Sequence, residues 1–219
     1  MKSLKLTIIS VGLVIFLVGC SSPKDASKNN FKKVINAYLE KNCIRVSLWK
    51  SDFPVIVELL PDDNLETILY PNKLKQYDAL VSIGFLEAKD GTAEINKNMF
   101  SNKIITVQTK VYSLTEKGNQ AFQQTTQKGF FGGANKGFCA GKYKINDVTN
   151  FSEPSQSGGH TISNVDFSIS PYKINDWANS QIIVDAFPQL AKKLEENQFR
   201  STTLVLMNDG WIHNKEMKK

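Results

Sequence analysis

Residues Leu80-Val81-Ser82-Ile83-Gly84-Phe85-Leu86 carry an apolar helical pattern that stops at a glycine and is followed at once by two apolar residues. The pattern begins upstream, where Asn72 is suited to cap a helix. The apolar positions after it recur at helical spacing: Leu74, Tyr77, Leu80 and Val81. Glycine commonly ends helices because it adopts positive φ without steric cost. We therefore predict a helix from Asn72 to Gly84 and a strand that starts at Phe85.

A second stretch, Tyr112-Ser113-Leu114-Thr115-Glu116-Lys117-Gly118, marks the passage from a strand to another helix. Residues 104–114 are typical of a strand, and the segment 89–101 that precedes them is polar. Thr115 is a favourable helix N-cap, because its hydroxyl can accept a hydrogen bond from the first turn. We expect a helix from Thr115 to about Gln124.

Together these two stretches resemble the winged-helix domain. In that family a helix ends at glycine, a two-stranded wing follows, and the second wing strand runs into a helix that starts Tyr-x-Leu-Thr-x-x-Gly. The resemblance covers roughly residues 73–122. It implies a winged-helix-like N-terminal module, to which we assign residues 31–128.

Winged helices often bind DNA, but the residues of this chain argue against that partner. The polar side of the helix that would contact DNA carries no arginine: Lys73, Lys75, Gln76, Asp78 and Ser82. Arginine makes the commonest specific base contact, and the whole chain has only Arg45 and Arg200. We therefore predict no nucleic-acid partner and expect the module to serve packing or protein contact.

The N-terminus has the pattern of an export signal. Lys2 and Lys5 precede an uncharged run, 6–18, which is shorter than the ~20 apolar residues that span a membrane. The run ends in Leu17-Val18-Gly19-Cys20, which resembles the lipobox of bacterial lipoproteins. The resemblance implies that residues 1–19 are a signal peptide and that Cys20 becomes the mature N-terminus. Its thiol would carry diacylglycerol and acyl chains such as palmitate, so that membrane lipid is the first partner.

Ser21 stands where an Asp would retain a Gram-negative lipoprotein in the inner membrane. The resemblance therefore implies the outer membrane, with the protein facing the periplasm. Residues 20–30 are polar, and we expect them to form a flexible tether. Two alternatives stay open: a secreted chain whose Cys20 is cut away or idle, and an uncleaved membrane anchor.

Composition places the mature chain among folded globular proteins. The 219 residues are 41% hydrophobic and 22% charged, which excludes collagen-like, disordered and polytopic membrane classes. The formal charge is +6, and it falls to +4 when Lys2 and Lys5 leave with the signal. This excess is compatible with an anionic partner but does not define one.

Two cysteines remain besides Cys20. An exported chain with Cys43 and Cys139 has one possible intramolecular pairing, so we predict a disulfide between them. The long loop that it would close corresponds to ~4.7 kcal/mol in the chain-entropy model. Two free buried thiols are the alternative.

The flanking segments complete an α+β fold prediction. Apolar residues at helical spacing predict a helix over 31–39 that Asn30 caps, and the glycines of 129–141 predict a linker. For residues 142–219 we expect a small, mainly antiparallel sheet with a helix packed on one face. The predicted strands are 142–146, 165–169, 202–207 and 211–212. The predicted helical stretch is 175–194, and Asp209-Gly210 is the predicted hairpin turn.

No motif for hydrolytic, dinucleotide or metal chemistry occurs in the sequence. We predict no catalytic residue, no cofactor and no metal, and we expect His160 and His213 to be exposed to solvent. Glu153 and Asp166 could meet across neighbouring strands, so an envelope hydrolase stays open as an alternative.

Exposed aromatic residues indicate a binding surface, whereas buried ones anchor the packing of the core. Five are candidate binding residues: Phe130, Phe131, Trp49, Trp177 and Trp211. The leading functional prediction is a non-catalytic module that binds an envelope protein or polymer. An immunity or antibiotic-protection lipoprotein is the alternative within the binding class.

Overall fold

The structure, a computed structural model, describes residues 22–46, 48–60, 68–96, 104–128 and 134–217. It is an α+β fold, as predicted, and every strand pairing in these ranges is antiparallel. No helix in the described part of the chain has the length and apolar character needed to cross a bilayer. The predicted signal peptide and Cys20 lie outside the described residues.

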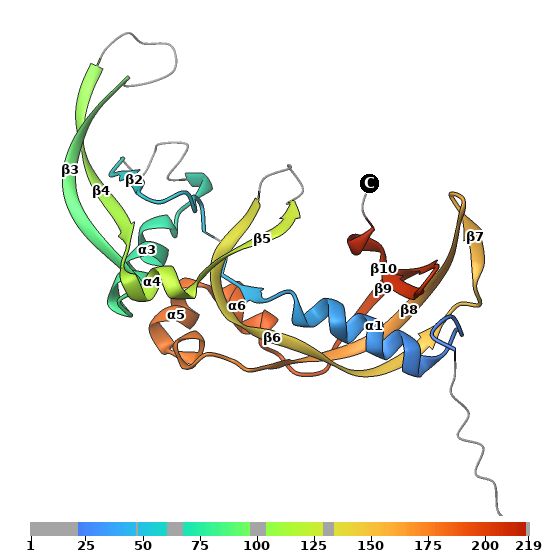
Figure 1. Ribbon diagram of the computed structural model, residues 1–219. Coiled ribbons are helices and arrows are strands. Elements are labelled where there is room, and N and C mark those ends of the chain that lie inside the picture. The colour runs from blue at the N-terminus through green and yellow to red at the C-terminus, as the bar shows by residue number, and fades with distance from the viewer. Residues whose placement is uncertain (1–21, 47, 61–67, 97–103, 129–133, 218–219) are drawn as a thin grey trace, which may run out of the picture.

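A three-stranded sheet carries the long hairpin that protrudes at one end of the molecule (Figure 1). Its strands lie in the order β2 (Val55–Glu58), β4 (Ile104–Leu114) and β3 (Leu86–Asn96). Helix α3 (Lys73–Ser82) precedes β3, and the chain leaves it at Gly84, whose φ is +74°. The polar segment predicted to separate two strands is itself partly strand, since β3 pairs with β4 out to Asn96.

The two stretches that predicted this fold meet at Thr115. Its hydroxyl donates to the Gly84 carbonyl oxygen at 2.7 Å and accepts from the Gly118 N–H at 2.9 Å, which caps α4 (Glu116–Ala121). A Cβ at Gly118 would lie 1.9 Å from the Phe85 carbonyl oxygen, so only glycine fits there. The helix is shorter than predicted, because the chain continues from Phe122 as β5.

The larger sheet is built around the long strand β6 (Ala134–Phe151). Its path is β1-β6-β8-β9-β10, with β5 paired to β6 and β7 paired to β8. The other strands are β1 (Ile44–Arg45), β5 (Phe122–Lys128), β7 (Ser155–Ser157), β8 (His160–Tyr172), β9 (Gln198–Met207) and β10 (Gly210–His213).

Residues 134–141 of the predicted linker belong to β6, which is a correction of that prediction. The glycines serve close backbone approach there. A Cβ at Gly137 would lie 2.7 Å from the Val46 carbonyl oxygen. Phe138, expected in a loop, is fully buried. Residues 129–133, with Phe130 and Phe131, lie outside the described residues.

Helix α1 (Lys28–Glu40) covers one face of the larger sheet (Figure 1). Its Phe31, Ile35 and Leu39 form a core with residues of β6, β8, β9 and β10: Ile145, Val148, Val165, Phe167, Ile169, Leu204 and Trp211. We had predicted that the 175–194 stretch would be the helix that covers a face of this sheet. That stretch is divided into η1 (Asp176–Asn179), α5 (Gln181–Ala186) and α6 (Pro188–Lys193), and it joins the other core instead.

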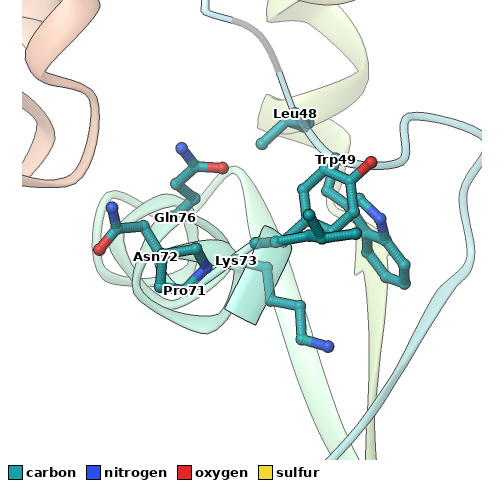
Figure 2. A pocket seen from close by; sticks show the side chains of 8 residues that line it. Leu48, Trp49, Pro71, Asn72, Lys73 and Gln76 are labelled. Atoms are coloured by element: carbon teal, nitrogen blue, oxygen red, sulfur yellow. The ribbon is translucent and has the colours of Figure 1, made fainter. Parts of the chain in front are cut away.

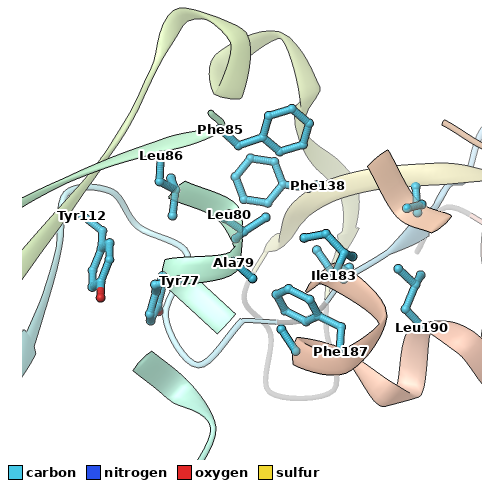
Figure 3. Close-up of a cluster of buried hydrophobic side chains, with 14 of the residues drawn as sticks. Tyr77, Ala79, Leu80, Phe85, Leu86, Tyr112, Phe138, Ile183, Phe187 and Leu190 are labelled. Atoms are coloured by element: carbon cyan, nitrogen blue, oxygen red, sulfur yellow. The ribbon is translucent and has the colours of Figure 1, made fainter. Parts of the chain in front are cut away.

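The second core connects the two halves of the chain (Figure 3). Tyr77 and Leu80 of α3 lie in one cluster with Phe138 of β6 and with Ile183 and Phe187 of α5 and its C-cap. Residues from both sides of the predicted linker therefore share one hydrophobic core.

The start of the described chain is bound to the body, although residues 20–30 were predicted as a tether. The Asn30 side-chain amide donates to the carbonyl oxygens of Ser22 and Asp25 at 2.7 and 2.9 Å. Ser27, not Asn30, is the N-cap of α1. Trp211 Nε1 donates to the Lys24 carbonyl oxygen at 3.0 Å. From Ser22 onward the chain is part of the fold.

Candidate binding surface

A hollow of about 300 Å³ opens beside Trp49, at the start of α3 (Figure 2). We call it the Trp49 hollow. It is lined by Leu48, Trp49, Leu69, Tyr70, Pro71, Asn72, Lys73 and Gln76. Leu48 and Trp49 come from the segment between β1 and β2. The other lining residues come from the segment that leads into α3 and from the first turn of that helix.

The Trp49 ring is surrounded by an aromatic ring and two cations. Its centroid lies 5.8 Å from that of Tyr70. The ammonium groups of Lys50 and Lys73 lie 3.9 and 5.1 Å from the ring centre. Lys73 was expected on the polar side of its helix but is only 5% exposed. Ammonium groups over an indole face are attracted by its negative quadrupole, which orients the ring in the hollow.

Tyr77 holds the Trp49 segment in place. Its hydroxyl donates to the Lys50 carbonyl oxygen at 2.8 Å and accepts from the Lys50 N–H at 3.0 Å. The ring is fully buried and stacks on Tyr112 with centroids 4.8 Å apart. Burial raises the pKa of Tyr77 to about 12, so the hydroxyl keeps its proton at neutral pH.

Apolar side chains are exposed on the rim of the hollow. Ile68 and Leu69 are each 60% exposed and Tyr70 is 44% exposed. A contiguous apolar surface of this kind is typical of a contact site for another molecule. The sequence signal was the short apolar run 68–71 before α3, which is too brief to predict an element.

The three tryptophans differ in their surroundings. Trp49 and Trp177 are half-buried, and Trp177 packs edge-on against Phe85 with centroids 5.3 Å apart. Trp211 is only 5% exposed and packs against Phe31. Of the three, Trp49 is the one that stands beside an exposed apolar rim, and Trp211 belongs to the core.

Cys43 and Cys139 are brought together by the pairing of β1 with β6, and both are half-buried. The structure holds them as free thiols, not as the predicted disulfide. The Cys139 thiol donates to the Gly141 carbonyl oxygen at 3.6 Å. The interaction between the two thiols lowers the pKa of Cys139 to about 7 and, with burial, raises the pKa of Cys43.

His213 is buried, which corrects the expectation that it is exposed; His160 is exposed as predicted. The His213 ring stacks on Tyr38 with centroids 3.7 Å apart. Its Nδ1 accepts from the Lys215 N–H at 3.1 Å, so Nε2 carries the proton toward the Thr202 hydroxyl 2.9 Å away. Burial lowers the pKa of His213 to about 4.

The carboxylates named for a hydrolase lie on the surface. Glu153 is exposed beyond the end of β6, and Asp166 is exposed on β8, where its Oδ1 accepts from the Ser201 hydroxyl at 2.5 Å. Within the described ranges, His, Cys, Asp and Glu side chains form no group of three or more that could hold a metal ion.

No protein-family model, no curated protein and no solved structure matches this chain. Its own residues and their geometry therefore carry the functional interpretation.

Proposed function

We propose that this chain is a lipid-anchored lipoprotein of the bacterial cell envelope that acts as a non-catalytic binding module, with the Trp49 hollow and its apolar rim as the contact site. The observation that carries the proposal is the exposed apolar surface of Ile68, Leu69 and Tyr70 beside the Trp49 ring. Trp and Tyr contribute large shares of binding energy at protein interfaces. The partner is an envelope protein or polymer that offers apolar groups to this surface.

The lipid anchor is the second part of the proposal. The lipobox resemblance at Cys20 supports it, and the described part of the chain begins at Ser22. Two extended residues span at most roughly 7 Å. A lipid on Cys20 would therefore keep the folded body against the membrane surface.

A winged-helix-like module for residues 73–122 is the third part. The strand order β2-β4-β3, the position of α3 directly before the β3–β4 hairpin, and the Thr115 cap of α4 support it. In this interpretation α3 serves protein contact, because its first turn lines the Trp49 hollow.

Two experiments test the parts separately. For the anchor, cells grown with an alkyne palmitate should label the wild-type chain and not Cys20→Ser; labelling of Cys20→Ser would contradict it. For the contact site, a photo-crosslinking amino acid is placed at Tyr70 in living cells. The matched control is Phe199 on β9, an aromatic residue that is 72% exposed.

The contact-site proposal expects one reproducible adduct from position 70 and a different, weaker pattern from position 199. Adding Trp49→Ala should abolish the adduct from position 70. The absence of an adduct at position 70, or equal capture from both positions, would overturn the proposed surface but leave the lipid anchor standing.

A further inference from the structure

A second hollow, of about 510 Å³, adjoins the Trp49 hollow, since Asn72 and Gln76 line both. We call it the Arg45 hollow. Its volume lies in the range of small-molecule sites. It is formed where α3 and β1 face α6, so its walls come from both halves of the chain.

Two cations line the Arg45 hollow, and no carboxylate does. The Lys193 ammonium donates to the Arg45 backbone carbonyl oxygen at 2.8 Å, which fixes the end of α6 against β1. Burial lowers the pKa of Lys193, and the nearby Arg45 charge lowers it further. Within the described residues, neither cation forms an ion pair with Asp or Glu.

The Arg45 guanidinium has an unused donor. Its Nε is buried and has no hydrogen-bond partner among the described residues. Buried donors are nearly always paired in folded proteins, because an unpaired one costs the free energy of its lost hydration. Arg45 thus keeps unused hydrogen-bonding capacity next to its full charge, and it lines the hollow together with a second cation, so an anionic acceptor in the hollow would be stabilised.

The rest of the lining indicates which anion fits. Amide side chains come from Asn72, Gln76 and Gln189, and these offer both donors and acceptors. Phe187 and Leu190 supply apolar surface. A phosphate ion alone would match the two cations but would leave the apolar surface of Phe187 and Leu190 uncovered. A carboxylate with a neighbouring amide and an apolar group satisfies all three kinds of lining.

We infer that the Arg45 hollow binds a small carboxylate ligand with an adjacent amide and an apolar substituent, as in the C-terminal residue of a peptide. The carboxylate is held by Arg45 and Lys193, the amide by Gln76 and Asn72, and the apolar group lies toward Phe187. This site adjoins the proposed contact surface and shares Asn72 and Gln76 with it, but its test requires neither the envelope partner nor the lipid.

The test is calorimetric titration of the full chain in neutral detergent with N-acetyl-leucine and with its uncharged analogue N-acetyl-leucinamide. We expect saturable binding of the acid and at least about tenfold weaker binding of the amide, because hydrogen bonds to charged groups are the strong ones. Arg45→Gln and Lys193→Gln should each weaken acid binding about tenfold or more. Lys192→Gln, at the exposed neighbouring position of α6, should leave it unchanged.

A second measurement needs no variant. The rate at which an amine-reactive reagent modifies Lys193 should fall when N-acetyl-leucine is added and stay unchanged with the amide, as read by peptide mass mapping. Equal binding of acid and amide, tighter binding of inorganic phosphate, an equal effect of Lys192→Gln, or unprotected Lys193 would each overturn the inference.

Discussion

The ring of Phe138 stacks on that of Phe85, with centroids 5.1 Å apart and planes 20° from parallel. Phe85 directly precedes β3 of the smaller sheet, and Phe138 lies in β6 of the larger one. Both are buried. This contact joins the two sheets through one core, so we expect residues 31–128 and 142–219 to unfold together.

Phe138→Ala tests this coupling. We expect the substitution to lower the free energy of unfolding by about 3–5 kcal/mol, because it removes a fully buried ring and leaves a cavity. Urea denaturation followed by circular dichroism measures the loss. Phe199→Ala, at an exposed position, should change stability by no more than about 0.5 kcal/mol. A loss of similar size in both variants would contradict the assignment of Phe138 to a shared core.

The cysteine pair should form a disulfide in an oxidising compartment. The pairing of β1 with β6 brings Cys43 and Cys139 together, so oxidation can join them once the two sulfurs approach to bonding distance. We expect these two thiols of the oxidised chain to resist alkylation until it is reduced, and then to take up one alkyl group each, as read by peptide mass spectrometry. Free alkylation of both thiols in native protein kept under oxidising conditions would show that the pair stays reduced.

In the reduced chain, Cys139 should be the reactive thiol. Its pKa of about 7 means that the thiolate fraction rises as pH increases through 7, while Cys43 stays protonated. The alkylation rate of Cys139 should therefore reach half its maximum near pH 7. Cys43→Ala removes the neighbouring thiol that lowers this pKa, so the midpoint should move toward the ordinary value of about 8.5. An unchanged midpoint would exclude Cys43 as the cause.

Stability should depend on His213 in mildly acidic solution. The folded chain keeps this ring neutral down to a pKa of about 4, whereas the unfolded chain binds a proton near 6.5. Between these values the unfolded state holds more protons, so the stability that His213 contributes is present above pH 6.5 and is lost as pH falls toward 4. The change amounts to about 3 kcal/mol for a shift of this size.

His213→Gln should remove that pH dependence, and thermal unfolding measured at steps from pH 7.5 to pH 4.5 would show it as a flatter profile. His160→Gln, at an exposed position, is the matched control and should follow the wild type. If the two variants give the same profile, the acid sensitivity has another source.

Tyr77→Phe should loosen the Trp49 segment without disturbing the core. The variant keeps the buried ring and its stack on Tyr112 but loses both hydrogen bonds to the Lys50 backbone. We expect a loss of about 1–3 kcal/mol, since the Lys50 N–H and carbonyl lose a buried partner. Faster amide hydrogen exchange at Lys50 than in wild type is the direct readout, and unchanged exchange would show that other contacts hold the segment.

Local signals in the sequence were sufficient for the elements whose cause is local. The helix over 31–39, the glycine exit at Gly84 and the Thr115 cap were all predicted, because each depends on spacing or on one residue's backbone preference. The hairpin near residue 209 was also predicted, but its two-residue turn is Asn208-Asp209, since Gly210 already pairs with Met207 as the first residue of β10. The antiparallel α+β class followed from alternating apolar residues in the same way.

Only the tertiary structure decided which faces meet. Periodicity marks an apolar side of a helix but does not say which sheet will cover it. Residues 31–39 were therefore grouped with the 31–128 module, and Gly137 was assigned to a linker, whereas α1 covers the larger sheet and Gly137 lies in β6. His213 and Lys73 are polar in sequence and buried in space because distant segments close over them. Arg45 and Lys193 are another example. Two like charges far apart in the sequence give no sign that they line one hollow, and the packing of α6 against β1 brings them there.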